Sequence, residues 1–275
     1  HLVTCANSAV KNIEKCIRNC GLSVDGFVLE QLASSHSILS EDEKDLGVCL
    51  VDIGGGTTDI AIFNSGSIVF TGVIPIAGDQ VTSDIAQALR TPTPQAEDIK
   101  QKHGCAVAEF TKDDESIEVP GVGGRPTREL SRSSLADIIQ PRYTELFELV
   151  KAEITRNGFE DKISAGIVFT GGTSKMEGVV ELAESIFQTS VRLGIPNKFS
   201  GMESILQNPI YATSIGLVDH GFKQKNDDLI AEQNQSWLSK LLKIVKSEYW
   251  FYISIPLECA FLGLHQLRSK SLTIR

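Results

Sequence analysis

Two apolar runs flank a polar interruption in the stretch VCLVDIGGGTTDIAIF, residues 48–63. Runs of this length, rich in Val and Ile, predict a β-strand on each side of the glycines. A third run, GSIVFTGVIPI, predicts the last strand of a meander over residues 48–76. The spacing then becomes helical in AGDQVTSDIAQALR, where Asp79 or Thr82 is expected to cap the helix.

The first 40 residues also alternate between strand and helix patterns. HLVTC and VDGFVLEQL predict strands, NSAVKNIEKCIRNCG and ASSHSIL predict helices, and SEDEKDLG is expected to be a solvated acidic link. Such alternation is typical of an α/β layer with a parallel sheet. Because the first strand begins abruptly at His1, the chain is expected to be a fragment that lacks its amino-terminal part.

Past residue 90 the pattern changes. TPTPQAEDIKQKHG predicts a short helix with Pro94 in its first turn and Gly104 at its end, and SIEVPGVGGRPTREL predicts short strands of an inserted subdomain. LADIIQPRYTELFELVKAEITRNG predicts a long helix that Pro141 breaks, kinks or restarts. A strand over 166–169, a glycine turn and a helix over 176–187 follow, and then the helical segment NPIYATSIGLVDHGF.

Composition narrows the class of protein. The chain has 275 residues, 41% hydrophobic and 22% charged, which is typical of a soluble globular protein of one large or two smaller domains. A net charge of −9 makes the surface as a whole repel nucleic acid, so no nucleic-acid partner is expected. None of the six cysteines forms a C-x-x-C pair, and Cys16 and Cys20 lack further zinc ligands nearby, which favours scattered thiols in a reducing cytoplasm.

The three consecutive glycines, Gly54 to Gly56, allow two interpretations. They can form the tight turn of a plain β-hairpin. They can also form a phosphate cradle, because glycine lets the backbone approach an anion and successive amides then point at it. A second turn of this kind, Gly171 and Gly172 followed by Thr173, joins the later strand to its helix. Two such turns in one chain favour nucleotide binding.

The chain resembles the actin-like ATPase superfamily, in which two α/β domains close over ATP and magnesium. VDIGGGTTD is similar to the second phosphate loop of that superfamily, and VFTGGTSKMEG is similar to its adenosine motif. EDIKQKHGCA, ESIEVPGVGGRPTREL, IQPRYTELFELVKAEI and YATSIGLVDHG resemble, in this order, the FtsA family of bacterial cell-division proteins. The resemblance covers residues 1 to about 250. It implies an α/β, actin-like (ribonuclease H-like) ATPase fold with an incomplete first domain and a complete second domain that carries a small α+β insertion.

The resemblance implies a role for individual residues. Asp52 is expected to contact Mg²⁺ through water, and Asp59 to brace the hairpin. The phosphates of ATP are expected to contact Gly54, Gly55, Gly56, Thr57 and Thr58, and the adenosine side Gly171, Gly172 and Thr173. Glu97 and Lys100 are expected at the ribose, with an exposed salt bridge as the alternative. No residue is a convincing nucleophile or general base, so at most slow ATP hydrolysis is expected.

The two glycine turns are expected to face each other across a cleft and to hold opposite ends of one nucleotide. In the family the first phosphate loop lies upstream of the position that corresponds to His1. This chain alone is therefore expected to bind ATP poorly.

A second candidate feature is the segment QSWLSKLLKIVKSEYW. On a helical wheel its apolar side chains fall within an arc of roughly 160°, with lysines opposite. It is either a helix packed on the core or, because its polar face is basic in an acidic chain, an in-plane helix at an anionic bilayer. The resemblance favours the membrane. The residues concerned are Trp237, Leu238, Leu241, Leu242, Ile244, Val245 and Tyr249, with Lys240, Lys243 and Lys246 on the polar face.

The expected organisation follows the family. Residues 251–275 continue past the point where the family normally ends. The expected segments are 1–43, the rest of the first actin-like domain; 44–90, the first part of the second; 91–165, the inserted subdomain and connecting helix; 166–222, the adenosine motif and return helix; 223–235, a linker; 236–250, the membrane-targeting helix; and 251–275, an atypical tail.

The resemblance implies a protein that binds ATP, polymerises at the cytoplasmic face of the bacterial inner membrane and anchors FtsZ filaments at the division site. Its expected partners are the FtsZ tail, copies of itself, anionic lipid and other division proteins. Four arginines of the inserted subdomain are expected to bind the acidic FtsZ tail, unless they are simply solvated: Arg125, Arg128, Arg132 and Arg142. The alternatives are a soluble sugar kinase or chaperone-type ATPase, and an MreB-type filament.

Overall fold

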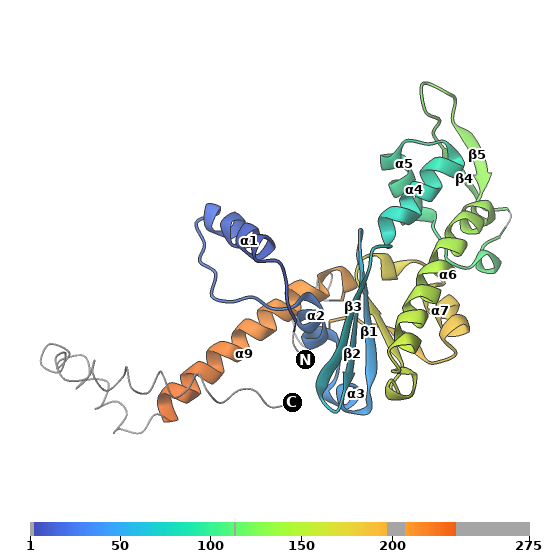
Figure 1. Cartoon of the computed structure of the whole chain (residues 1–275). Coiled ribbons are helices and arrows are strands. Elements are labelled where there is room, and N and C mark those ends of the chain that lie inside the picture. Colours follow the sequence, from blue (N-terminus) through green and yellow to red (C-terminus); the bar gives the residue numbers. More distant parts are fainter. Residues whose placement is uncertain (1–2, 113, 197–206, 235–275) are drawn as a thin grey trace, which may run out of the picture. The chain divides into compact units, whose positions relative to one another are not determined.

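The computed structural model describes residues 3–112, 114–196 and 207–234, and the chain divides into two units, His1–His220 and Gly221–Arg275 (Figure 1). The first half contains three helices, a three-stranded meander and two further helices. These elements are α1 (Asn7–Asn19), α2 (Glu30–Ile38), α3 (Glu41–Leu46), β1 (Val48–Ile53), β2 (Thr58–Asn64), β3 (Ser67–Ile74), α4 (Gly78–Leu89) and α5 (Thr93–His103).

The second half begins with a short hairpin and a 25-residue helix, and it returns to the main sheet with two more strands. Its elements are β4 (Ser116–Val119), β5 (Arg128–Ser131), α6 (Arg132–Arg156), β6 (Ile167–Thr170), α7 (Val179–Phe187), β7 (Val191–Leu193) and α9 (Ala212–Asn234).

The main sheet has the strand order β3-β2-β1-β6-β7. The first three strands form the predicted antiparallel meander, while β6 pairs in parallel with both β1 and β7. The parallel pairing is possible because β4, β5 and α6 supply a long crossover between β1–β3 and β6. A mixed α/β sheet of this kind confirms the predicted fold class.

Alternation along the strands divides the core into two clusters, one on each face of the sheet. Val48 and Leu50 of β1 face the cluster that includes Ile38 of α2. Cys49 and Val51 face the opposite, larger cluster, to which α4, α6 and α7 contribute. In Figure 1, α2 lies on one side of the sheet, and α6 and α7 lie on the other. Any side chain on the first face near the end of β1 therefore lies beside α2.

Residues 91–165, expected to form the inserted subdomain and connecting helix, contain helices and short strands, as the pattern predicts. α5 ends at its C-cap, Gly104, as expected, and the two short strands, β4 and β5, pair antiparallel. Pro141 neither ends nor restarts α6, which runs through it as one helix. Since proline removes one amide donor from a helix, packing compensates here: Ile139, Tyr143 and Leu146 are all buried.

Several local predictions were wrong. Residues 3–6 and 21–29 form no strand, and α2 begins at Glu30 inside the segment predicted as a strand. The acidic segment, expected to be a solvated link, contains the helix α3. Ser40 and Glu43 form a capping box at its amino-terminal end. Residues 223–234, expected to be a linker, continue α9. Neither Asp79 nor Thr82 caps α4, because Gln80 accepts the hydrogen bond from the N-cap amide of Ala77.

Candidate functional site

The two glycine turns lie at the same edge of the sheet. β1 and β6 are parallel neighbours with Asp52 opposite Thr170, so the turns that follow them emerge side by side. Gly171 has a φ of +86°, and a Cβ there would lie 2.4 Å from the carbonyl oxygen of Ile53 and 2.5 Å from Oδ1 of Asp52. Only glycine allows the second turn to pack this closely against the end of β1.

A direct hydrogen bond joins the turns. Thr173 Oγ1 donates to the carbonyl oxygen of Gly54 at 2.7 Å. Tyr143, buried in α6, supports the second turn from behind by donating its hydroxyl to the carbonyl of Thr173 at 2.9 Å. The turns therefore adjoin each other, whereas the sequence predicted that they face each other across a cleft. Together they form one backbone surface on which Gly55, Gly56 and Thr57 are exposed.

The start of α4 also contacts the first turn. The amide of Gly78 donates to the carbonyl of Gly54 at 3.2 Å, and the amide of Asp79 donates to the carbonyl of Gly55 at 2.8 Å. A Cβ on Gly78 would lie 2.4 Å from Thr173 Oγ1, so a side chain there would displace the hydroxyl that joins the two turns. Three separate segments of the chain thus meet at Gly54.

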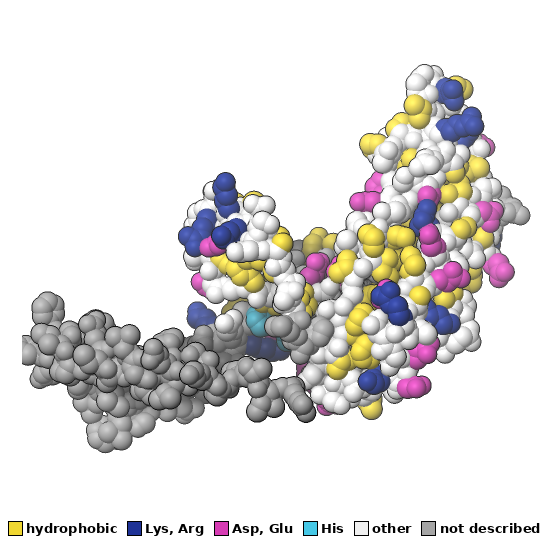
Figure 2. All heavy atoms as spheres, viewed as in Figure 1, with side chains coloured by type: hydrophobic (Ala, Val, Ile, Leu, Met, Phe, Trp, Pro, Cys, Tyr) yellow, Lys and Arg dark blue, Asp and Glu magenta, His cyan; other side chains and the backbone are white. Residues whose placement is uncertain are grey.

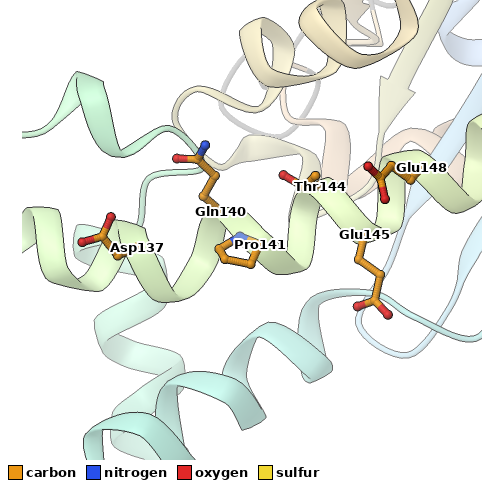
Figure 3. A pocket seen from close by; sticks show the side chains of 6 residues that line it. All are labelled: Asp137, Gln140, Pro141, Thr144, Glu145 and Glu148. Carbon is orange, nitrogen blue, oxygen red and sulfur yellow. The ribbon is translucent and has the colours of Figure 1, made fainter.

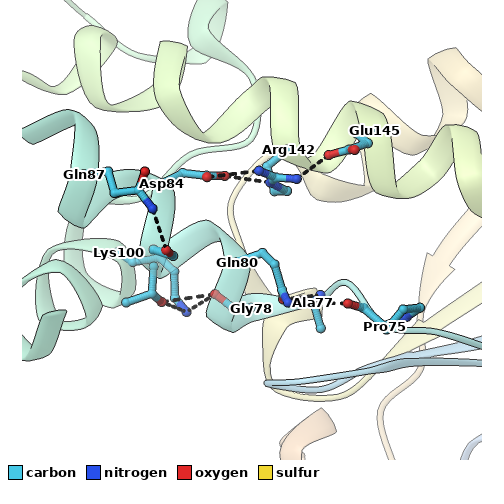
Figure 4. A network of polar contacts seen from close by, with 11 residues as sticks. Pro75, Ala77, Gly78, Gln80, Asp84, Gln87, Lys100, Arg142 and Glu145 are labelled. Atoms are coloured by element: carbon cyan, nitrogen blue, oxygen red, sulfur yellow. Dashed lines mark hydrogen bonds and ion pairs between the residues drawn. The ribbon is translucent and has the colours of Figure 1, made fainter.

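Lys100 fastens this arrangement to the inserted subdomain (Figure 4). Its ammonium is buried and donates to the carbonyl of Gly78 at 3.0 Å and to Thr82 Oγ1 at 2.8 Å. It also pairs with Glu97 Oε2 at 2.7 Å. Burial pushes the pKa of Glu97 upward, but hydrogen bonds from Lys100 and Thr82 outweigh it, so that the net shift is downward. Glu97 and Lys100 therefore form a partly buried pair next to the turns, and their expected ribose contact stays a prediction.

Two carboxylates face each other across the hairpin. Asp52 of β1 and Asp59 of β2 are cross-strand partners on the face that α2 covers. Burial raises the pKa of Asp52, and the nearby charge of Asp59 raises it further. Burial likewise raises the pKa of Asp59. Like charges at directly opposed positions repel each other. Binding of a cation, or of a proton by one of the carboxylates, would relieve this repulsion.

Four further residues belong to the site and were missed by the sequence interpretation. Ser34 Oγ donates to Asp52 Oδ2 at 3.0 Å, and Thr213 Oγ1 lies 3.5 Å from the same oxygen. Gln31 Nε2 donates to Asp59 Oδ1 at 2.8 Å. Burial raises the pKa of Glu30, and so do the charges of Asp59 and Asp52. Glu30, Gln31 and Ser34 stand on α2, within or just after the segment misread as a strand, which hid their position beside the hairpin, whereas Thr213 stands on α9.

The donor set suits magnesium through a water shell. Carboxylate and carboxamide oxygens are the hard ligands that Mg²⁺ prefers, and the ion usually keeps several waters. Within the described ranges, no three His, Cys, Asp or Glu residues are placed to hold a metal ion directly. Asp52, with one oxygen bonded by Ser34, therefore fits a hydrated ion better than an ion coordinated only by protein.

The four predicted partner arginines do not form one free patch. Arg142 is paired with Asp84 and Glu145, and Arg132 with Glu115 and Glu177. Arg128 donates to the carbonyl of Leu89, and Arg125 is exposed in the loop between β4 and β5. Figure 2 shows basic side chains at this end of the subdomain. The expected partner contact stays a prediction.

A hollow of about 450 Å³ lies elsewhere, along one side of α6 (Figure 3). It contains none of the predicted nucleotide residues. Six residues line it, of which the first and the last two are acidic: Asp137, Gln140, Pro141, Thr144, Glu145 and Glu148. All six stand on one helix at intervals of three or four residues, so the hollow is a groove on the helix surface.

The predicted membrane residues and the tail, 236–250 and 251–275, lie outside the described residues. Among the helices that are described, none has the length and apolar character needed to cross a bilayer.

Comparison with known sequences identifies close relatives. A family model described as "Cell division protein FtsA" matches residues 49–216. The cell division protein FtsA of Pseudomonas aeruginosa is 62% identical over 229 residues, which cover 83% of this chain and 55% of that protein. FtsA of Escherichia coli K12 is 45% identical over 262 residues, which cover 90% of this chain and 62% of that protein. The chain thus spans little more than half the length of these relatives.

Solved structures with low sequence identity to this chain have the same fold. An MreB protein of Spiroplasma citri bound to AMPPNP matches with a TM-score of 0.69 at 20% identity, covering 82% of this chain and 68% of that one. A chain of the PilM–PilN type IV pilus biogenesis complex matches with a TM-score of 0.61 at 19% identity, covering 78% and 57%. At such identities the likeness establishes the actin-like fold alone.

Proposed function

The chain belongs to the FtsA family of cell-division proteins and has an actin-like fold, and on that premise we propose that it binds ATP with Mg²⁺, polymerises at the inner membrane and anchors FtsZ filaments there. The observation that carries the nucleotide proposal is the junction at Gly54. Two glycine turns from distant parts of the chain meet at one edge of the sheet and are joined by the Thr173 hydroxyl.

The two turns divide the nucleotide between them. The exposed backbone of Gly55, Gly56 and Thr57 offers amides and a hydroxyl to the phosphates, since glycine allows an anion close approach. Gly172 is exposed on the neighbouring turn and offers a flat surface to the adenosine side. Asp52 lies between the turns and orients the water shell of Mg²⁺, whose charge would offset that of the phosphates.

A titration with a fluorescent ATP analogue tests the nucleotide proposal. The full-length protein, as wild type and as Asp52→Ala, is titrated with the analogue in buffer that contains Mg²⁺ and, separately, in buffer that contains EDTA. We expect the wild type to bind more tightly with Mg²⁺, and the variant to lose most of that gain. Asp161→Ala, which removes an exposed carboxylate after α6, serves as the control. Equal Mg²⁺-dependent affinity in Asp52→Ala would refute the assignment of the first turn.

The membrane proposal rests on the amphipathic pattern of residues 236–250 together with family membership. A lysine-only polar face on a chain of net charge −9 favours an anionic surface over the protein's own core. One helix of this length binds reversibly, and a filament would hold many copies at the membrane at once. Polymerisation and membrane attachment therefore support each other in the proposal.

The FtsZ contact is proposed at the β4–β5 hairpin. Arg125 is exposed there and Arg128 lies near it, while Arg132 and Arg142 are already paired with acidic side chains. An acidic peptide would find the uncompensated positive charge at the hairpin, because charge complementarity guides such docking. The two paired arginines hold α6 against α4 and against the residues that precede β4 and α7, and they contribute less to this contact.

A further inference from the structure

Gln31 has a buried oxygen that the described part of the protein leaves without a hydrogen bond. The side chain is buried, with only 4% of its surface exposed, in the first turn of α2. Its Nε2 donates to Asp59 Oδ1 at 2.8 Å, whereas Oε1 is buried and has no partner among the described residues. Buried polar atoms are nearly always hydrogen-bonded, so an exception needs an explanation.

The orientation of the carboxamide follows from its neighbour. An ionised carboxylate accepts hydrogen bonds and cannot donate them, so the nitrogen of Gln31 must face Asp59. The carbonyl oxygen then points away from Asp59 and requires a donor. Turning the amide over would place two acceptors against each other, and the position of Oε1 is therefore imposed by the site.

The neighbouring side chains cannot supply that donor. Asp52, Asp59 and Glu30 act as acceptors when ionised, and the hydroxyl of Ser34 is directed to Asp52. Among the residues that the structure describes, no donor reaches Oε1. Water bound to a divalent cation is the matching chemistry, because the opposed carboxylates attract the cation and its water shell carries strong O–H donors.

We propose that Gln31 is a positioning residue of the nucleotide site, which holds Asp59 with its amide and a water of the hydrated magnesium ion with its carbonyl. This inference rests on the proposed nucleotide function. Asp59 Oδ2 in turn accepts from Thr57 Oγ1 at 3.1 Å, so the hydrogen-bond chain leads from α2 through Asp59 to the exposed glycine turn. Gln31 thereby couples the hydration of the ion to the shape of the phosphate-binding turn.

The test compares wild type with Gln31→Met in the full-length protein. Methionine has a similar length and removes both polar atoms, and Gln87→Met makes the same change at an exposed position of α4 as the control. Affinity for a fluorescent ATP analogue is measured with Mg²⁺ and with EDTA. We expect Gln31→Met to reduce the Mg²⁺-dependent gain by about tenfold, as outer-shell substitutions do, and to leave the affinity in EDTA unchanged.

A second measurement does not depend on the folding of a variant. In ¹⁵N-labelled wild type, the side-chain amide signal of Gln31 should shift when Mg²⁺ and ATP are added together, and not when ATP is added with EDTA. If wild type gains affinity with Mg²⁺ but Gln31→Met gains equally, and the signal does not move, Gln31 has no such role and the proposed function stands. If wild type binds no nucleotide under any condition, both proposals fail together.

Discussion

The hydroxyl of Thr173 donates a 2.7 Å hydrogen bond to the carbonyl of Gly54, 119 positions earlier in the chain. This bond is made where β1 and β6 end side by side. Gly78 closes the same junction, because its amide donates to Gly54 and its missing side chain leaves room for the threonine hydroxyl. Displacement of the Thr173 hydroxyl would therefore break the hydrogen bond that holds Gly54, the first residue of the exposed glycine turn.

Removal of this hydroxyl should loosen the first turn. Thr173→Val keeps the shape of the side chain but leaves the Gly54 carbonyl without that donor, which should lower the free energy of unfolding by about 1 kcal/mol. Nucleotide affinity should fall as well, because the turn is less well held. Thr173→Ser, which keeps Oγ1, is the matched control. Chemical denaturation and nucleotide titration measure the two effects, and equal behaviour of both variants would contradict the role of the hydrogen bond.

Replacing Asp52 by Asn should stabilise the protein while weakening its response to magnesium. The pKa of Asp52 is raised by burial and by Asp59, so the folded state binds its proton more tightly than the unfolded state does. The stability that this group contributes is present below its ordinary pKa of 3.8 and is lost as the pH rises through the raised value. At neutral pH, Asp52→Asn should therefore gain on the order of 1 kcal/mol.

The pH dependence provides the check. Unfolding free energies of wild type and Asp52→Asn, measured in denaturant from pH 3 to pH 8, should coincide most closely at the acidic end and separate as the pH rises. A difference that stays constant over the whole range would mean that the carboxylate does not titrate differently in the folded state. Glu97→Gln is an informative comparison, because the pKa of Glu97 is lowered and its effect should have the opposite sign.

Membrane attachment should depend on the apolar face of the segment 236–250. Leu241→Glu combined with Leu242→Glu places two charges within the apolar arc, and burial of charge in the interface is unfavourable. The double variant should no longer co-sediment with vesicles that contain anionic lipid, whereas the wild type should. Lys225→Glu, outside this segment, controls for the change in net charge. Undiminished co-sedimentation of the double variant would remove the membrane proposal.

Binding of the FtsZ tail should depend on the β4–β5 hairpin. Reversing the charge of Arg125 and Arg128 should reduce retention of a synthetic FtsZ tail peptide several-fold, and the loss should diminish with added salt. Arg156→Glu at the far end of α6 changes the net charge by the same amount as one of these reversals and serves as the control for a single reversal. Because Arg128 also donates to Leu89, Arg125→Glu alone should be measured in addition. Equal retention by all variants would exclude the hairpin as the docking site.

Local patterns predicted much of the fold and of the site. The meander β1–β3, the helices α4 and α5, the β4–β5 hairpin and both glycine turns were visible because each depends on the spacing of neighbouring residues. The segment before α2 was misread, since VDGFVLEQL has the apolar density of a strand and only its packing decides otherwise. Residues 223–234 were misread as a linker for the converse reason, because a run of polar residues gives no periodic apolar signal even when it is helical.

The sequence by itself determined that the chain carries two glycine turns bracketed by acidic and hydroxyl side chains, because backbone freedom and side-chain chemistry are properties of single residues. Only the tertiary structure decided that Thr173 bonds Gly54, that Asp52 opposes Asp59, and that Gln31 and Ser34 hold those carboxylates. These contacts depend on strand register and on which face of the sheet α2 covers. Both are set by long-range burial of apolar surface, which no local spacing records.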